Sequence, residues 1–369
     1  MATKIFVMTH KKYDEVNDPA YISLQVGAAS NGRIEGYLWD DDGEDNISAK
    51  NYLYGELTGI YWLWKHYHDA DNIGICHYRR FYVDENDYNR ILREKDFENI
   101  LKEYDVIVAD PGETPISVGD YFARCHNIED LEITKAAVAK LTPEYGETLE
   151  MVLNGNTAFG ANLMVIGHEL FDEYCGWLFK ILEEAEKTID VTGYDGYHKR
   201  IYGFLSEILM DVWIEYKKLK VYGAKVRLAG EKVETIELKN TLAEYVREGR
   251  YTEARKAYFE CMQMRPDVAL AVSDLNDEIH AIEVILYILE KEEEAGISGF
   301  ARVSSELKEI VGHFKYLEDI LHALETGTAD ENMIEYLLGA GLSDIAKDAI
   351  LKFSRKIEHP ELVRKIMGI

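Results

Sequence analysis

Three short segments place polar side chains beside runs that are typical of β-strands. Thr9, His10 and Lys11 follow the apolar run KIFVM, and the run HYRR at 77–80 follows NIGIC. Asn154, Gly155 and Asn156 stand shortly before the run LMVI. In open α/β sheets, ligands bind beyond the carboxyl ends of strands. A Thr-His-Lys run in that position suits a nucleotide base, a ribose or a phosphate, although a solvated loop would look the same.

The segment 77–80 is the strongest candidate for binding an anion. His77, Tyr78, Arg79 and Arg80 stand together at a strand end, and arginine matches phosphate geometry with two parallel hydrogen bonds. Ion pairing with surface carboxylates is the plain alternative. The segment 154–156 offers glycine for close backbone approach and asparagine as both donor and acceptor, which suits a sugar, but an ordinary turn has the same composition.

Two acidic elements are candidates for further chemistry. The run DDDGED at 40–45 contains Asp40, Asp42 and Asp45, which we keep as weak candidate ligands for Mg²⁺ or Mn²⁺ because hard cations prefer oxygen. A solvated loop is the alternative. Glu207 lies in the otherwise apolar run GFLSEILMDVW. Burial there would raise its pKa and suit it to general base catalysis, whereas a helix-surface glutamate is the simpler interpretation.

Composition limits the classes of function. The chain has 369 residues, a formal charge of −27 and four cysteines without a CxxC motif. So acidic a chain disfavours a nucleic-acid partner, because phosphate backbones need a basic face. We expect reduced thiols and a cytoplasmic protein, since no signal-peptide pattern and no apolar run of membrane-spanning length is seen. No nucleophilic hydrolase motif, Walker A motif or dinucleotide-binding glycine motif is found.

The elements that must position these residues indicate two domains. Strand-like runs at 4–8, 72–76, 105–109, 161–166 and 220–226 alternate with helical patterns at 49–67, 168–188 and 197–217. This alternation predicts an α/β layered domain with a partly parallel sheet. The remainder consists of helical patterns, at 242–262, 275–295, 302–326 and 331–357. We therefore expect an α/β domain over 1–235 and an all-α domain over 236–369, either a bundle or a pair of helices resembling one tetratricopeptide repeat.

Five segments in order resemble a bacterial family first catalogued as domain of unknown function 4422. They are KIFVMTHKKY, DNISAKNYLYGELTGIYWLWKHY, IGICHYRRFY, NGNTAFGANLMVIGHELFDEYCGWLFKILEEAEK and GYHKRIYGFLSEILMDVWI. The resemblance covers roughly residues 3–228, and the helical remainder lies outside it. The family includes capsular and exopolysaccharide glycosyltransferases, so the resemblance implies a GT-A-like nucleotide-sugar-binding α/β sandwich.

The resemblance also implies an activity and partners. The donor would be a UDP-hexose, with galactose or galactofuranose as candidates, and the acceptor a saccharide, expected to be lipid-linked at the inner face of the membrane. The position of an Asp-x-Asp metal motif is taken by IGICHYRR. His77, Arg79 and Arg80 would then neutralise the diphosphate, and no cofactor would be required, with Mn²⁺ or Mg²⁺ left open. The residues at 9–11 and 154–156 would line the donor site. Glu207 is the first candidate for the base, and His10 is the second.

Two other functions compete with sugar transfer. One is a carbohydrate- or nucleotide-binding module without catalysis, whose helical domain recruits partners. The other is a scaffold that assembles through its helices, with the α/β domain as a spectator. A homo-oligomer formed through the helical domain is a further expectation. Docking at a membrane surface would need a partner or the helical domain, because the chain has no basic tail.

Overall fold

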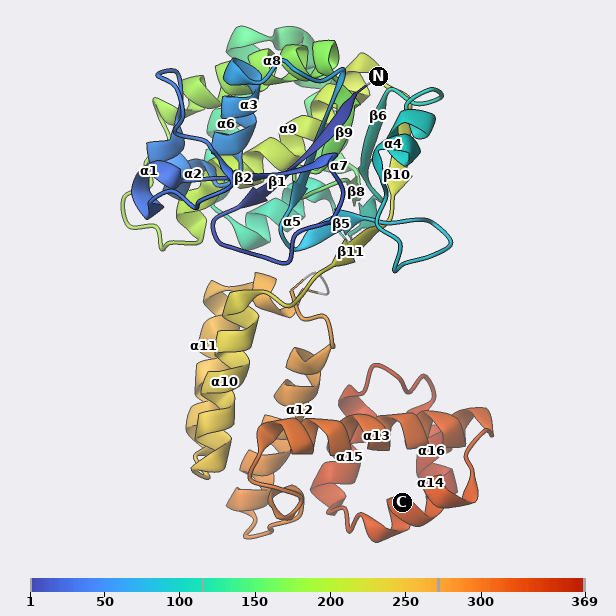
Figure 1. Ribbon diagram of the computed structural model, residues 1–369. Coiled ribbons are helices and arrows are strands. Elements are labelled where there is room, and N and C mark those ends of the chain that lie inside the picture. The colour runs from blue at the N-terminus through green and yellow to red at the C-terminus, as the bar shows by residue number, and fades with distance from the viewer. Residues whose placement is uncertain (1, 115, 271–272, 368–369) are drawn as a thin grey trace. The chain divides into compact units, whose positions relative to one another are not determined.

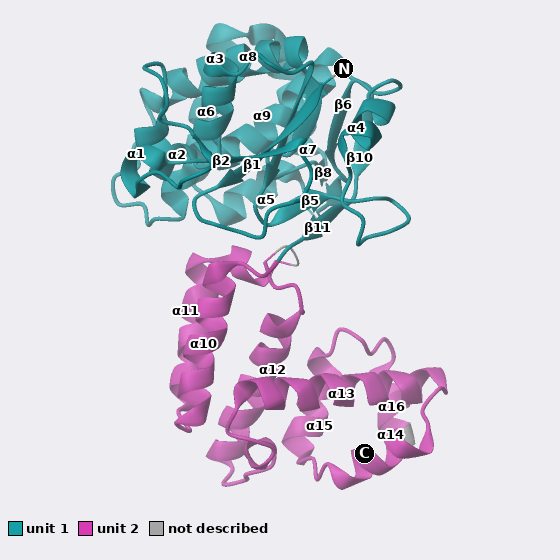
Figure 2. Cartoon of the chain, in the orientation of Figure 1, with its two compact units in different colours: residues 1–229 teal, residues 230–369 magenta. Residues whose placement is uncertain are grey.

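The computed structural model describes residues 2–114, 116–270 and 273–367. The chain divides into two compact units, Met1–Ala229 and Gly230–Ile369, shown in teal and magenta in Figure 2. The sequence placed this division at 235/236. Each unit has its own hydrophobic core and is described by itself.

The first unit is built on a mixed, nine-stranded sheet (Figure 1). Along its main path the order is β10-β6-β9-β4-β1-β2-β3, and β5 pairs with β4 and with β11. Neighbours on this path are parallel except β9, which is antiparallel to both β4 and β6. The strands are β1 (Thr3–Thr9), β2 (Tyr21–Gln25), β3 (Leu38–Trp39), β4 (Asn72–His77), β5 (Arg80–Tyr82), β6 (Val106–Ala109), β9 (Met164–Gly167), β10 (Val221–Ala224) and β11 (Val226–Leu228), with a separate pair β7 (Gly112–Glu113) and β8 (Thr157–Ala158).

Both faces of the sheet are buried. Alternate residues of β1 face opposite cores: Phe6 and Met8 join the larger one, while Ile5 and Val7 join the smaller. The smaller core is completed by α4 (Glu94–Ile100), through Phe97. The helices whose residues enter the larger core are α2 (Asn51–Tyr54), α3 (Leu57–His66), α5 (Val118–Cys125), α6 (Ile128–Leu141), α7 (Gly146–Asn154), α8 (His168–Glu186) and α9 (Ile201–Lys217); the short α1 (Ala28–Asn31) follows β2.

Three expected elements differ from those observed. The helix expected over 49–67 divides into the 3-10 turn η1 (Ser48–Lys50), α2 and α3, because Gly55 has a φ of 55° that a helix does not allow. The strand expected over 161–166 begins only at Met164, because Ala161 and Asn162 have left-handed backbone. The strand expected over 220–226 is two strands, β10 and β11, separated at Lys225.

The described residues of the second unit form helices joined by turns and loops, without a strand. Its seven α-helices are α10 (Val233–Arg247), α11 (Tyr251–Met264), α12 (Glu278–Glu294), α13 (Leu307–Thr326), α14 (Glu331–Gly339), α15 (Asp344–Phe353) and α16 (Pro360–Met367). The pattern expected over 242–262 becomes α10 and α11, which pack together and are separated at Gly249, where φ is 70°. Helix α12 is the centre of the core, since it packs on α11, α13 and α15. The predicted α/β fold followed by a helical region is confirmed.

No helix in the described ranges is long and apolar enough to cross a membrane.

Candidate active site

The carboxyl ends of β1 and β4 bring the first two predicted segments together, because these strands are parallel neighbours. The Thr9 hydroxyl donates to the carbonyl oxygen of Lys11 at 2.5 Å and accepts from the Lys11 amide at 3.2 Å. Thr9 is buried, so its side chain shapes the turn. The ring of His10 lies perpendicular to that of Tyr78, with centroids 5.3 Å apart, and Lys11 Nζ is 5.2 Å from the same ring.

His77 is a neutral donor at the end of β4. Burial lowers the pKa of His77 to about 4; the charge of Glu56 opposes this shift, and the charges of Arg80 and Arg79 add to it. Nδ1 lies 3.4 Å from Arg80 Nη1, and a guanidinium can only donate, so Nδ1 accepts and the proton sits on Nε2. Nε2 is buried and has no hydrogen-bond partner among the described residues. The ring therefore holds an unused N–H for a ligand.

Arg80 is a partly buried cation in the same turn. Burial lowers the pKa of Arg80, whereas the charges of Glu207 and Glu56 raise it. In the part of the chain that the structure describes, no carboxylate lies within 4.0 Å of its guanidinium. Removing a cation from water without a partner is costly, and arginine recognises carboxylates and phosphates with its planar fork. The position of Arg80 therefore favours an anionic ligand.

Helix α9 presents two carboxyl groups one turn apart. Burial raises the pKa of Glu207 to about 7, the charge of Glu56 raises it further, and the charge of Arg80 lowers it. Burial likewise raises the pKa of Asp211 to about 8. The Phe159 amide donates to Asp211 Oδ2 at 3.3 Å, and the Ala161 amide donates to Glu207. Glu207 thus titrates near neutral pH, as a general base should.

The loop that supplies these amides has unusual backbone geometry. Gly160, Ala161 and Asn162 have φ values of 63°, 62° and 49°, so three successive residues are left-handed. Non-glycine residues rarely adopt this conformation, which persists only where the surroundings impose it. Here the contacts of the fully buried Asn162 side chain hold the loop in this conformation. Its Nδ2 donates to Glu56 Oε1 at 2.8 Å, and its Oδ1 accepts from the Ser206 hydroxyl at 3.0 Å.

The predicted residues at 154–156 make local hydrogen bonds. Asn154 Nδ2 donates to the carbonyl of Glu150 in its own helix, and the Asn156 carbonyl accepts from the Thr114 amide at 2.7 Å. Gly155 follows the end of α7, with a φ of −72° that any residue can adopt. A role for these three residues in donor binding stays a prediction.

The sequence of this unit matches a family model. The model describes a domain of unknown function, DUF4422, and it matches residues 4–218. The chain belongs to this family. Among solved structures, the chain is similar to one described as the WbbM bifunctional glycosyltransferase in its apo form, with 27% sequence identity and a TM-score of 0.58. The similarity covers 62% of this chain and 46% of that one, so the chain spans less than half the length of WbbM. No curated protein matches the sequence.

Three residues of this DUF4422 site were missed by sequence reasoning. Glu56, whose charge acts on His77 and Glu207, lies inside the predicted helix 49–67 without any local signal. Asn162 is one of three asparagines in its segment, and only its contacts single it out. Asp211 did carry a signal, since it is a second acidic residue four positions after Glu207 in an apolar helix.

The candidate metal ligands at 40–45 make other contacts. Asp40 is fully buried and accepts four hydrogen bonds, from the amides of Gly27 and Ala28 and the hydroxyls of Ser48 and Thr58. Asp42 is 3.7 Å from Arg33 Nη2, and Asp45 is 3.5 Å from Lys65 Nζ. Asp40 thus holds the turn after β2 together. A role for the three in metal binding stays untested.

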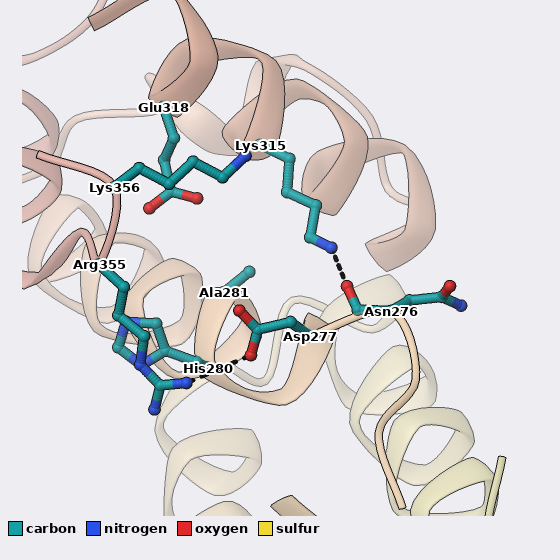
Figure 3. A pocket seen from close by; sticks show the side chains of 8 residues that line it. All are labelled: Asn276, Asp277, His280, Ala281, Lys315, Glu318, Arg355 and Lys356. Carbon is teal, nitrogen blue, oxygen red and sulfur yellow. Dashed lines mark hydrogen bonds and ion pairs between the residues drawn. The ribbon is translucent and has the colours of Figure 1, made fainter. Parts of the chain in front are cut away.

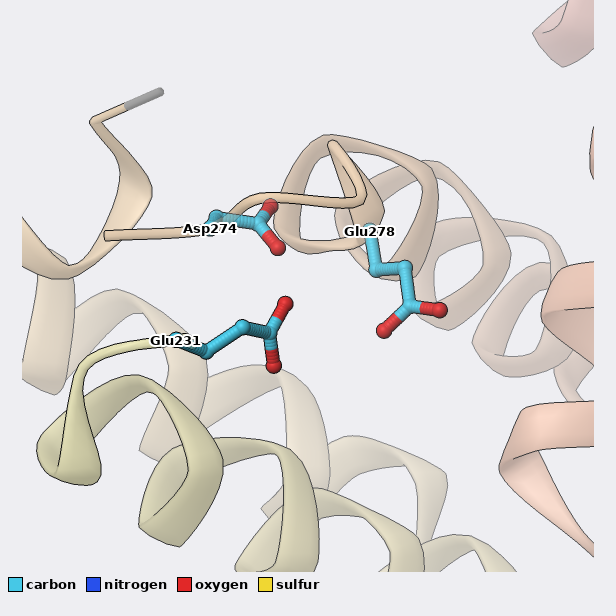
Figure 4. Close-up of side chains that lie close together, drawn as sticks. All are labelled: Glu231, Asp274 and Glu278. Carbon is cyan, nitrogen blue, oxygen red and sulfur yellow. The ribbon is translucent and has the colours of Figure 1, made fainter. Parts of the chain in front are cut away.

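Outside the range matched by the family model, three carboxylates of the second unit lie close enough to share one ion. Glu231, Asp274 and Glu278 have oxygen atoms within 4.8 Å of one another (Figure 4). Lys239 already occupies the centre, because its Nζ lies 2.7 Å from an oxygen of each. The side-chain ammonium group of Lys239 is therefore the cation that this cluster holds.

A cavity of about 240 Å³ also lies in the second unit (Figure 3). Its wall consists of Asn276, Asp277, His280, Ala281, Lys315, Glu318, Arg355 and Lys356. Arg355 pairs with Asp277 at 3.2 Å, and Lys315 donates to the Asn276 carbonyl. The wall thus mixes three basic side chains with two carboxylates, and we assign it no ligand.

Proposed function

We propose that the first unit is a glycosyltransferase that moves a hexose from a UDP-sugar donor to a saccharide acceptor. The observation that carries this proposal is Arg80, a partly buried guanidinium that has no carboxylate partner among the described residues. It lies beside the Nε2–H of His77, which has no hydrogen-bond partner among the same residues. A diphosphate supplies the acceptors that both groups lack. Membership of the DUF4422 family and the similarity to WbbM support the reaction class.

In this proposal Glu207 is the base. With a pKa near 7, its carboxylate form is populated at neutral pH and takes the proton of an acceptor hydroxyl. The acceptor oxygen then forms a bond to the anomeric carbon. The bond from that carbon to the diphosphate oxygen breaks, and its electron pair leaves with UDP. His10 is the second candidate for the base, because it is exposed at the end of β1.

Arg79 and Arg80 stabilise the negative charge that develops on the leaving diphosphate, and His77 adds a neutral hydrogen-bond donor. Fixed cations at the leaving group stabilise the transition state as a metal ion would, so we propose that no metal is required. The carboxylates at 40–45 keep Mg²⁺ or Mn²⁺ as the alternative, and titration of Mn²⁺ against activity separates the two.

The biological setting forms the finer part of the proposal. Galactose or galactofuranose as the transferred sugar, a lipid-linked acceptor and a role in capsular or exopolysaccharide synthesis follow from the family resemblance. Such an acceptor would place the enzyme in the cytoplasm, at the inner face of the membrane. The second unit is the candidate for membrane docking or self-association, because it lies outside the region matched to the family.

Calorimetric titration with UDP tests the proposal directly. The wild-type chain should bind UDP, and Arg80→Ala should lose this binding. Arg90→Ala is the matched control, because Arg90 is an exposed arginine whose carboxylate partners, Asp84 and Asp96, are already present. UDP affinity unchanged in Arg80→Ala would contradict the diphosphate site.

A further inference from the structure

One face of α9 continues beyond the candidate base. Arg200, Phe204, Glu207 and Asp211 follow one another at spacings of four, three and four residues, so they lie along one side of the helix. Residues three apart on a helix have Cβ atoms roughly 5–6 Å apart, which is about the width of a hexose ring. A sugar lying on Phe204 would therefore bring a hydroxyl to Glu207.

Phe204 belongs to a group of three rings in mutual contact, which we call the aromatic platform: His126, Tyr197 and Phe204. The His126 and Phe204 rings are stacked with centroids 4.1 Å apart, and the Tyr197 ring is 4.9 Å from Phe204 and 5.9 Å from His126. All three side chains are partly exposed. The rings come from the end of α5, from the loop before α9 and from α9 itself, so distant segments build this surface.

Polar and charged groups surround the aromatic platform. The Arg200 guanidinium lies 5.3 Å from the Tyr197 ring and 5.9 Å from the Phe204 ring, and its charge also lowers the pKa of Glu207. His198 pairs with Asp195 at 2.6 Å. Apolar ring faces flanked by a few fixed polar groups are what a small-molecule site offers, and the C–H faces of a hexose stack on such rings while its hydroxyls bind the flanking groups.

A purely structural role explains the stacking less well. Other contacts already fix the loop 190–200 on the α5–α6 junction. His198 Nε2 lies 3.2 Å from the Cys125 carbonyl, and the Tyr194 hydroxyl donates to Asp130 at 2.9 Å and accepts from Asn127. The loop therefore has anchors apart from the aromatic platform.

We infer that the aromatic platform binds a hexose unit of the acceptor, next to Glu207 on the same side of α9. This inference rests on the proposed function for the order of the reaction. The carbohydrate site itself depends only on the rings and their surroundings.

The test is saturation-transfer NMR on the full-length chain with octyl β-glycosides of galactose, glucose, mannose and N-acetylglucosamine. We expect at least one glycoside to bind the wild type. Tyr197→Ala and Phe204→Ala should each weaken the affinity for that glycoside by about threefold to tenfold, as expected for a lost ring contact. Tyr197→Phe should retain binding, because it keeps the ring.

Tyr216→Ala is the matched control. Tyr216 also lies on α9 and is 36% exposed, and its ring lies 3.7 Å from that of Tyr145, but it stands near the other end of the helix. Its glycoside affinity should equal that of the wild type. Thermal unfolding of each variant checks that it is folded, and Tyr197→Ala carries the test if Phe204→Ala does not fold.

Two results would overturn the inference: no glycoside binds the wild type, or the folded ring variants bind as the wild type does. UDP titration of the same samples separates this outcome from failure of the proposed function. If the chain binds UDP but no glycoside, only the inference about the aromatic platform is contradicted. If the chain binds a glycoside but no UDP, the carbohydrate site is supported and the transferase proposal is contradicted.

Discussion

Asn162 donates a hydrogen bond to Glu56 at 2.8 Å, and this contact joins the left-handed loop to the carboxylate that influences the whole site. The charge of Glu56 raises the pKa of both His77 and Glu207 and that of Arg80. Glu56 is therefore the electrostatic centre of the site, although we assign it no contact with substrate.

Glu56→Gln should shift the pH dependence of transfer to lower pH. Removing a neighbouring negative charge lowers the pKa of Glu207, so the base is deprotonated at lower pH. The measurement is kcat/KM against pH, in which the acid limb of the profile should shift to lower pH. Glu173→Gln is the control, because Glu173 pairs with Lys217 on the surface. An unchanged acid limb would contradict either the role of Glu207 as the base or the effect of Glu56 on its pKa.

Glu207→Gln should retain UDP binding and lose transfer by about 10²–10⁴-fold, the usual contribution of a positioned general base. Turnover of the donor and calorimetry with UDP report the two properties separately. Glu215→Gln, at an exposed position on the same helix, should behave as the wild type. If Glu207→Gln turns over normally, His10 becomes the candidate base.

Asp211→Asn should change how the stability of the first unit depends on pH. The raised pKa of Asp211 means that the folded state binds its proton more tightly than the unfolded chain does. The free energy of unfolding therefore falls as the pH rises from about 4 to about 8, and the contribution of Asp211 is fully present only below the unfolded pKa. The variant should lack this fall and be more stable at pH 8.

Urea denaturation followed by tryptophan fluorescence measures this effect in the first unit alone. All five tryptophans, Trp39, Trp62, Trp64, Trp177 and Trp213, belong to that unit. Parallel pH profiles for the wild type and Asp211→Asn would show that Asp211 is not the group responsible.

Asn162→Ala should destabilise the first unit by about 1–3 kcal/mol, because it leaves Glu56 and Ser206 without their buried partner. The same fluorescence measurement gives the free energy of unfolding. Asn154→Ala is the matched control, since the Asn154 side chain is exposed and donates to the carbonyl of Glu150 in its own helix. Equal stability of the two variants would mean that the left-handed loop holds without Asn162.

Lys239→Met should destabilise the second unit by about 3–5 kcal/mol, because three carboxylates would lose their shared cation. Added Ca²⁺ should restore part of this stability in the variant and have no effect on the wild type. The measurement is thermal unfolding followed by circular dichroism. Lys256→Met is the control, because Lys256 is an exposed residue of α11. Wild type that is itself stabilised by Ca²⁺ would contradict the ammonium assignment.

The sequence predicted the elements better than the contacts between them. β1, β4 and β6 were predicted because strands buried on both faces read as short, nearly continuous apolar runs. β2, with the mixed run YISLQ, and the three-residue β5 gave no such signal. HYRR and Glu207 could be singled out because they interrupt apolar runs. Glu56 could not, because its role arises from residues that are distant in the sequence and that only the fold brings near it, such as His77 and Asn162.

Strand β9 has a consequence for how the site forms. Because β9 is antiparallel to β4, with Met164 opposite Ile75, its beginning lies at the edge where β4 ends. The donors of Phe159 and Ala161 are therefore held at the site only when β9 is paired with β4 in the sheet. Pairings this distant in sequence form late and slowly. UDP affinity should therefore report completed folding of the first unit, and a refolding intermediate that lacks β9 should have helical circular dichroism without nucleotide binding.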